Sequence, residues 1–413
     1  METTETVRLG CWPAGTNGGT VADALTAALR PQPPTMHVSN PTDHTGWLSM
    51  KQLFVLVTAV LIGTLSGCGG SSVGFNVYTA GDSLTDSGTF GFRFTLAGTS
   101  AAPNRVWPEL VAASLVMTEP CARYKGDPAT GIVETNPAAL SCTGYAVGGA
   151  RINPSGQTND STPYSVLKQI RDLVGERRTL GDRDLVLISG GANDAADLFA
   201  LWLKAQDNTP ASAANYLALL KELLTDAELA GETDPNKRAI LYMVKLANTL
   251  ADTVRDQLLA SGARRVLFAN LPDLTRTPKL QAVLTPLQQP ALFTFARELS
   301  VQFNDQFARR FASDSRVAIY SLLDALDAWV TDPPPEFTQV TTPACPATPN
   351  TPTPTYDLSK CTATLLSSAD VAQGRPANWW DRYLFADDFH PTPRGHAEAA
   401  AQVVQILRSR GWN

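Results

Sequence analysis

The stretch Phe75-Asn-Val-Tyr-Thr-Ala80, followed by Gly81-Asp82-Ser83-Leu84, decides the fold. Aromatic and β-branched residues fill the first part and glycine opens the second, so the stretch predicts a strand that runs into a tight turn. Three similar apolar runs follow at 184–189, 265–270 and 317–321, and a shorter one lies at 145–147. We expect each of these runs to form a strand of one sheet.

Helical patterns separate the predicted strands. The clearest occupy 106–115, 165–174, 240–259, 290–311 and 394–410. Apolar strands alternating with amphipathic helices predict an α/β fold, in which helices cover both faces of a parallel sheet. Such a sheet carries its functional site at the carboxyl ends of the strands. We therefore expect 81–83, 191–194 and 270–273 to lie at that edge.

Composition excludes several classes of function. The 413 residues carry a net charge of -6 and no basic block, so no electrostatic footprint for nucleic acid is present. The sequence holds no phosphate loop, dinucleotide fingerprint or metal-ligand cluster, so we expect neither cofactor nor metal. The oligomeric state stays open.

A short apolar segment precedes the predicted domain. It starts at Met50-Lys51, runs through 53–65 and ends in Ser66-Gly67-Cys68. The run is too short for a membrane-spanning helix, which needs about 20 residues, and its flanks are typical of a secretory signal. The ending resembles a bacterial lipobox, in which the cysteine is lipidated and becomes the first mature residue. The alternative is a short buried core helix.

We therefore predict a lipoprotein signal peptide at 50–67, lipidation at Cys68 and a flexible tether at 68–74. The protein would be exported and held by its lipid at the bacterial cell envelope, on the outer membrane or facing the periplasm. Residues 1–49 are a doubtful leader without periodicity, and we expect translation to start at Met50 or Met36. The remaining residues, 75–413, form the predicted domain.

Two stretches of this domain read as insertions. Residues 198–238 are helical and polar, which is typical of a side flap or cap. Residues 331–359 are rich in proline and threonine, so we expect order only where a disulfide ties them.

Four cysteines remain in the mature chain, at positions 121, 142, 345 and 361. They allow three pairings, and an oxidising compartment favours disulfides over four free thiols. The sequence-local choice is Cys121–Cys142 with Cys345–Cys361, each stabilising the fold by about 3 kcal/mol through loop entropy. Their spacing does not match a zinc site.

Histidine limits the choice of a general base, because the mature chain has only His390 and His396. Asp387 precedes His390 by three residues, so in a turn its carboxylate can bind Nδ1–H and leave Nε2 free to accept a proton. Asp388 is the rival acid. His396 lies in a predicted helix without an acid at that offset, so we expect a packing or helix-surface side chain.

A histidine base requires a nucleophile, and Ser83 stands on the turn after Gly81, where backbone strain can expose a side-chain oxygen. The alternative for Asp82-Ser83 is a simple helix cap. Ser83 does not lie in the usual Gly-x-Ser-x-Gly elbow, because Thr85 stands where that pattern has its second glycine.

Four blocks of the sequence resemble the GDSL esterases and lipases, also called SGNH hydrolases. Gly-Asp-Ser-Leu-Thr-Asp-Ser-Gly at 81–88 is similar to their first block, Gly-Tyr-Ala-Val-Gly-Gly-Ala at 144–150 to the second, Gly-Ala-Asn-Asp at 191–194 to the third and Asp-Asp-Phe-His-Pro-Thr at 387–392 to the last. The resemblance spans 75–400 apart from the insertions. It implies a three-layer, flavodoxin-like fold.

The resemblance also implies a role for each matching residue. Ser83 attacks the ester carbonyl, His390 moves the proton and Asp387 orients His390. The oxyanion hole consists of the backbone N–H groups of Ser83 and Gly149 and the side-chain amide of Asn193, since preorganised donors stabilise the developing charge. Gly148 is the rival of Gly149. Gly144 stands where many members have asparagine, and we assign it no role.

The predicted function is hydrolysis of carboxylic esters, of acyl or lipid type, through a covalent acyl-enzyme. The partners would be a small-molecule or lipid ester and, through the anchor, a membrane. The alternatives are a carbohydrate acetyl-esterase, an acyltransferase and, in another class, a non-catalytic surface binding protein. Five aromatic residues either line an acyl pocket or belong to the core: Phe90, Phe92, Phe94, Trp379 and Trp380.

Overall fold

A parallel sheet lies at the centre of the computed structural model, which describes residues 75–98, 104–154, 161–177, 179–349 and 354–412. The strand order is β1-β4-β5-β6, with β1 (Asn76–Ala80), β4 (Asp184–Ser189), β5 (Val266–Ala269) and β6 (Val317–Tyr320). These four strands confirm the apolar runs predicted from the sequence. The doubtful leader, the predicted signal peptide, Cys68 and the tether lie outside the described residues.

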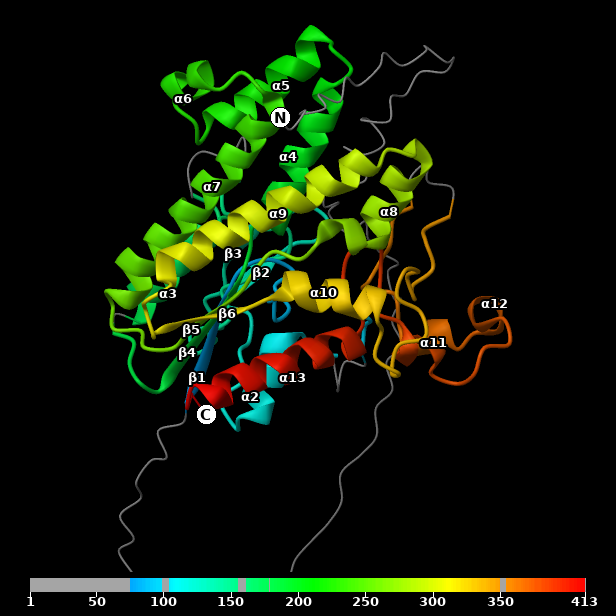
Figure 1. The fold of residues 1–413 in the computed structure, drawn as a ribbon. Helices are drawn as coiled ribbons and strands as arrows, with labels where there is room; N and C mark the ends of the chain where they lie inside the picture. Colours follow the sequence, from blue (N-terminus) through cyan, green and yellow to red (C-terminus); the bar gives the residue numbers. More distant parts are fainter. Residues whose placement is uncertain (1–74, 99–103, 155–160, 178, 350–353, 413) are drawn as a thin grey trace, which may run out of the picture.

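Helices α3 (Val166–Arg177), α4 (Ala192–Ala205), α7 (Pro235–Thr253) and α9 (Pro290–Phe311) cover one face of the sheet (Figure 1). Alternate strand residues face these helices and are almost fully buried, among them Val186, Val266 and Phe268. Phe268 packs against Phe307 of α9, with the ring centroids 4.3 Å apart. This face holds the larger part of the core.

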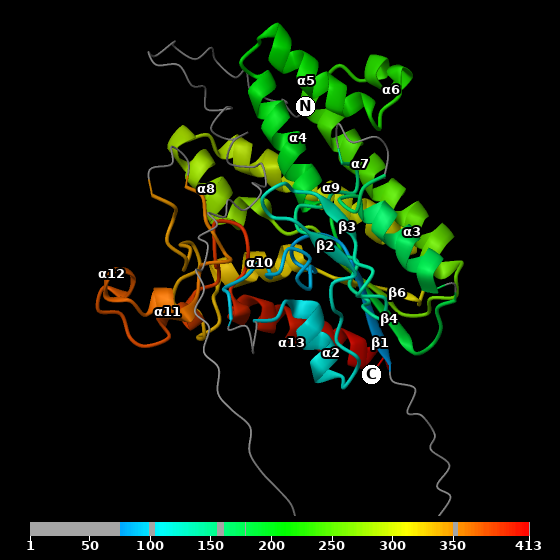
Figure 2. The ribbon, with the colours of Figure 1, turned by 180° about the vertical axis from the view of Figure 1, so that it is seen from behind.

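The other face packs against α2 (Trp107–Ser114), α10 (Leu322–Thr331) and α13 (Pro393–Ser409), as the view from behind also shows (Figure 2). Here the intervening strand residues are buried, among them Leu185, Leu187 and Leu267. Because neighbouring strand residues point to opposite faces, both faces are apolar and the strands read as continuous hydrophobic runs. The three-layer α/β fold is thus the predicted one.

The second glycine block runs along the free edge of β1. Thr79 donates its backbone N–H to the Thr143 carbonyl at 3.0 Å, and Tyr145 donates to the Thr79 carbonyl at 2.8 Å. The expected strand at 145–147 is therefore not a regular strand, but a segment joined to β1 by an isolated parallel bridge at Gly144. This pairing sets the second glycine block beside the turn that follows β1.

The first insertion is helical. It contains the rest of α4, then α5 (Pro210–Lys221), α6 (Asp226–Gly231) and the start of α7, which stand together at the top of the molecule in Figure 1. Thr225 and Glu228 form a capping box at α6, and Asp234 caps α7. These caps explain why so polar a stretch keeps well-defined helices.

The second insertion borders the last motif of the chain. In its described part the Ala344 N–H donates to the Phe385 carbonyl at 2.9 Å, and the Cys345 N–H donates to the Ala386 carbonyl at 2.8 Å. The disulfides Cys121–Cys142 and Cys345–Cys361 are both formed, which confirms the sequence-local pairing. The second insertion is thereby fixed directly beside 387–390.

Short elements complete the described fold. The antiparallel pair β2–β3 and several short helices lie around the sheet: β2 (Tyr124–Gly126), β3 (Val133–Thr135), η1 (Val254–Leu259), η2 (Leu274–Arg276), α8 (Pro278–Leu284), η3 (Thr285–Leu287), α11 (Ala363–Leu366), α12 (Ala369–Ala372) and η4 (Trp379–Arg382). Trp379 and Trp380 are buried in a small cluster with Leu96 and the Cys345–Cys361 bridge, so they are core side chains. Among the described helices, none combines the length and apolarity needed to cross a bilayer.

Candidate active site

The turn after β1 presents Ser83. Gly81 has a φ of +143°, and a Cβ atom there would lie 2.3 Å from the Ser189 carbonyl oxygen, so only glycine fits. The buried Gln169 holds this glycine on both sides. Its Oε1 accepts the Gly81 N–H at 2.6 Å, and its Nε2 donates to the Gly81 carbonyl at 3.0 Å.

Ser83 is not a helix cap, because the first described helix, α2, begins only at Trp107. The preceding Asp82 is bound to the end of β4, where its Oδ1 accepts the Ser189 hydroxyl at 2.8 Å, and the same oxygen accepts the Leu84 N–H at 3.1 Å. Burial raises the pKa of Asp82, and these hydrogen bonds lower it in part. Asp82 therefore fixes the turn that exposes the next residue.

His390 connects two segments that are far apart in the sequence. Its Nε2 lies 2.8 Å from the Ser83 Oγ, across 307 residues of sequence, and its Nδ1 lies 2.7 Å from the Asp387 Oδ2. The Asp387 Oδ1 accepts the backbone N–H groups of Phe389 at 2.8 Å and His390 at 2.6 Å. The structure thus brings together the serine, histidine and aspartate named from the sequence.

The electrostatics of Asp387 suit an acceptor that stays ionised. Burial alone would raise its pKa, but the charge of His390 and the hydrogen bonds from the imidazole and two backbone amides bring it below the ordinary value. The rival Asp388 does not bind the imidazole. Its carboxylate Oδ2 lies 3.7 Å from the Lys279 Nζ instead.

His396 lies apart from this arrangement. It is buried within α13, and its Nδ1 accepts the backbone N–H of Trp107 at 3.3 Å. Burial lowers the pKa of His396 to about 3, so the ring is neutral at physiological pH. The packing role expected from the sequence is the one observed, and the helix-surface alternative is wrong.

The second glycine block is attached to the first through Asp86. Its Oδ2 accepts the Gly148 N–H at 2.8 Å, while its Oδ1 accepts the N–H groups of Gly88 at 2.9 Å and Thr89 at 2.7 Å. Burial raises the pKa of Asp86 to about 6. Because the Gly148 N–H is occupied, the following Gly149 is the better candidate for a donor to a ligand.

The segment after Gly148 is fastened to the start of α4. Arg151 donates from Nη1 to the Gly149 carbonyl at 2.7 Å and forms an ion pair with Asp197. Asp194 accepts the backbone N–H groups of Ile152 and Asn153 at 2.9 and 2.8 Å, and Asn193 donates from Nδ2 to the Ala150 carbonyl at 2.9 Å. These contacts fix Gly149, whose φ is +78°, and Asn193 relative to each other.

Several of these supporting residues were not predicted from the sequence. Asp86 and Asp194 lie within the motif blocks, so their place in these blocks could have indicated a role at the site. Gln169, Arg151 and Asp197 carry no local signal, because their partners are distant in the sequence.

One of the five aromatic candidates contacts the histidine ring. Phe94 lies beside His390 with the ring centroids 5.1 Å apart, and Phe92 lies 5.2 Å from Phe94. Phe90 is buried and packs on both. Phe94 and Phe92 therefore offer an apolar surface next to the site, while Phe90 belongs to the core.

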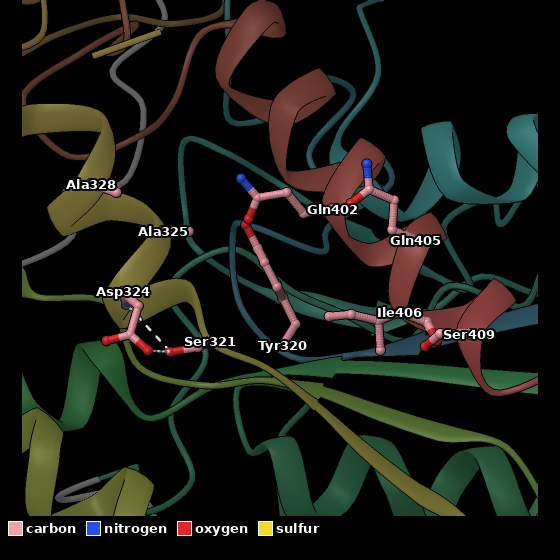
Figure 3. A pocket seen from close by; sticks show the side chains of 9 residues that line it. All are labelled: Tyr320, Ser321, Asp324, Ala325, Ala328, Gln402, Gln405, Ile406 and Ser409. Carbon is pink, nitrogen blue, oxygen red and sulfur yellow. Dashed lines mark hydrogen bonds between the residues drawn. The ribbon is translucent and has the colours of Figure 1, made fainter. Parts of the chain in front are cut away.

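A surface pocket of about 760 Å³ lies elsewhere, between α10 and α13 (Figure 3). None of its lining residues is a predicted site residue: Tyr320, Ser321, Asp324, Ala325, Ala328, Gln402, Gln405, Ile406 and Ser409. Its acid, Asp324, accepts the Ser321 hydroxyl at 2.6 Å at the start of α10, as a capping pair does. Chemistry, not pocket size, therefore identifies the site.

Comparison with known proteins agrees with the motif blocks. Residues 77–403 match the family model for GDSL-like Lipase/Acylhydrolase, which covers most of the chain. No curated protein matches the sequence significantly. The matched range includes Ser83 of the first block near its start and His390 of the last block near its end. These are the two residues that the fold brings into contact. The chain belongs to the GDSL-like lipase/acylhydrolase family.

Proposed function

We propose that the protein cleaves carboxylic esters through a Ser83–His390–Asp387 triad and a covalent acyl-enzyme. The observation that supports this most strongly is the continuous hydrogen-bonded chain from the Ser83 Oγ to the His390 Nε2, at 2.8 Å, and from the His390 Nδ1 to the Asp387 Oδ2, at 2.7 Å. A serine hydroxyl is a weak nucleophile alone and requires an adjacent base. Family membership supports an ester bond as the target.

The first step is attack of the Ser83 Oγ on the ester carbonyl carbon while its proton passes to the His390 Nε2. Asp387 stabilises the imidazolium and holds its tautomer. The tetrahedral intermediate then collapses: the bond from carbon to the alcohol oxygen breaks, and that oxygen takes the proton from His390. Water then attacks the acyl carbon while His390 accepts its proton. The bond from that carbon to the Ser83 Oγ breaks, Ser83 takes the proton back from His390, and the acid leaves.

Three donors would stabilise the oxyanion of the intermediate: the backbone N–H groups of Ser83 and Gly149 and the amide of Asn193. A primary amide has two hydrogens, and one of those of Asn193 is already bound to the Ala150 carbonyl. The other remains for the oxyanion. Removal of one such donor typically costs about 3 kcal/mol in the transition state.

The substrate class we favour is an acyl or lipid ester. Phe94 lies beside His390 and Phe92 lies beside Phe94, so the two rings provide apolar surface for a hydrocarbon chain. A carbohydrate acetyl ester has little to gain from such a surface, and an acyltransferase must exclude water from the acyl-enzyme. A non-catalytic binding protein has no need of a hydroxyl, an imidazole and a carboxylate in one hydrogen-bonded chain.

The experiment compares the hydrolysis of p-nitrophenyl butyrate by the protein and by Ser83→Ala, His390→Ala and His396→Gln. The first two should lose roughly six orders of magnitude in kcat with unchanged circular dichroism, because the nucleophile or base is gone. His396→Gln should retain most activity at pH 8. Full activity in folded Ser83→Ala would contradict the proposal.

Substrate class is tested by a graded series of p-nitrophenyl acyl esters, a phospholipid and an acetylated xylan. The proposal expects kcat/KM to rise from acetate to medium-length chains. A preference for the acetylated polysaccharide would favour the carbohydrate esterase, and ester synthesis in water with an added alcohol would favour the transferase.

A further inference from the structure

The loop that carries the predicted base is held from one side by a lysine. Lys279, in the first turn of α8, donates its backbone N–H to the Asp388 carbonyl at 2.9 Å. Its Nζ lies 3.7 Å from the Asp388 Oδ2 and 5.7 Å from the centroid of the Phe389 ring. The Lys279 and Asp388 side chains are each only 16% exposed, so the pair is largely shielded from water.

This pair stands directly beside His390. Asp388 is two residues from it, and the Phe389 ring, which contacts Lys279, is 5.7 Å from the imidazole ring. A shielded positive charge makes protonation of a neighbouring imidazole harder, and a shielded negative charge makes it easier. With both charges present the two effects oppose each other.

Asp388 is the sensitive member of the pair. Burial raises the pKa of Asp388 to about 6, and the Lys279 ammonium counteracts that rise. At neutral pH the carboxylate is therefore ionised and paired. Without the lysine the pKa of Asp388 rises further, and wherever the carboxylate stays ionised its charge stands uncompensated next to Asp387.

We propose that Lys279 and Asp388 are positioning residues for His390, and that the balance of their two charges sets the lowest pH at which the enzyme works. This inference rests on the proposed function. Lys279 would act on His390 through Asp388 and Phe389 and would not contact the substrate.

Other titratable groups also face His390 from the surrounding elements. They are Asp387 in its own loop, Asp82 after β1, His396 in α13 and, through Asp387 and Asp388, Tyr356 in the second insertion. All of these residues are retained in the variants below. The variants therefore differ only in the charges of Lys279 and Asp388.

The test is the pH profile of kcat/KM for p-nitrophenyl butyrate. Lys279→Met removes a positive charge, so the acid limb should move up by about half a pH unit, which lowers the rate about threefold on that limb. Asp388→Asn leaves the ammonium uncompensated and should move the limb down. The double variant should return it close to that of the unmodified protein, and Lys279→Arg should keep it there.

The matched control is Lys245→Met, which removes a lysine of α7 that pairs with Glu228 of the helical insertion at 2.5 Å and should leave the acid limb in place. Shifts of the same sign in both single variants, or no shift in either folded variant, would overturn the inference. Failure of this inference can be distinguished from failure of the proposed function. The inference fails if the pH profiles of the active variants do not shift as described, whereas the proposed function fails if Ser83→Ala stays active.

Discussion

At the residue scale, the site depends on buried polar side chains whose hydrogen-bonding groups have partners. Asp387 accepts three hydrogen bonds, one from the imidazole and two from backbone amides of its own turn. An ionised carboxylate has the acceptor capacity for all of them. The neighbouring Asp388 is directed to Lys279, and this division explains why only one of two adjacent acids orients the histidine.

His396 shows the opposite chemistry, a histidine that must stay neutral. Its Nδ1 accepts the Trp107 N–H, and protonation would destroy that acceptor. Burial lowers the pKa of His396 from 6.5 to about 3. Between these pH values the unfolded chain binds a proton that the folded protein does not, so the free energy of unfolding falls as the pH falls.

We therefore expect His396→Gln to have a flatter pH dependence of stability. Urea unfolding of the unmodified protein should lose about 3 kcal/mol through this group between pH 7 and pH 4, and the variant should lack that loss. Buried acids with raised pKa values act in the opposite sense in both proteins and cancel in the comparison. Equal slopes in the two proteins would show that His396 does not titrate in this way.

Residue roles were predictable where the signal is local. Asp387 and His390 are three residues apart, and the turn that orients Ser83 lies next to it in the sequence. Gln169 lies 88 residues from Gly81, and Arg151 lies 46 residues from Asp197. No short spacing pattern in a single sequence indicates that residues so far apart are paired, so these supporting residues were identified only from the structure.

At the element scale, strands were predicted better than their surroundings. The strands are buried on both faces, so each reads as a short apolar run between turns. The alternative of a helix cap at Asp82-Ser83 is wrong, because residues 81–98 form turns and bends and contain no helix. Polar contacts of Asp82, Thr85 and Asp86 with distant segments hold those turns in place of helical hydrogen bonds.

The second disulfide links two segments that flank the site. Cys345 donates its N–H to the Ala386 carbonyl, one residue before Asp387, and the Cys361 carbonyl accepts the Ala97 N–H, close to Phe94. The bridge therefore connects the segment just before the histidine loop, residues 387–390, to the segment just after Phe94. It closes a loop with a sequence separation of 16 residues.

Replacing Cys345 and Cys361 together by serine should lower the free energy of unfolding by about 3 kcal/mol. It should also lower kcat, because the backbone that carries Asp387 loses its fixed neighbour. The matched variant replaces Cys121 and Cys142, which should cost similar stability with a smaller loss of kcat. Urea unfolding and ester hydrolysis measure the two effects, and equal losses of kcat in both variants would contradict the expected link to the histidine loop.

At the scale of the whole molecule, the alternation of strands and helices was sufficient to predict three layers and the edge that carries the site. The motif blocks added the residues, because four separate segments converge at that edge. The position of the 331–359 insertion could not be predicted, since it depends on the Cys345–Cys361 bridge and on backbone pairing with 385–386.

The attachment to a membrane remains a proposal from the sequence. If Cys68 is lipidated, the full-length protein expressed in bacteria should sediment with membranes and enter the detergent phase. Cys68→Ser should shift it to the soluble fraction, because a single residue then no longer carries the acyl chains. Fractionation with immunoblotting measures this, and a variant that stays with the membranes would count against the anchor.

The proposed function requires that His390 activates Ser83 and that Ser83 becomes acylated. The most direct measurement is mass spectrometry of the protein after reaction with a p-nitrophenyl alkylphosphonate, which traps an activated serine. We expect one adduct, located on the peptide that contains Ser83 and absent from His390→Ala. An adduct on a different residue, or equal labelling of the His390→Ala variant, would contradict it.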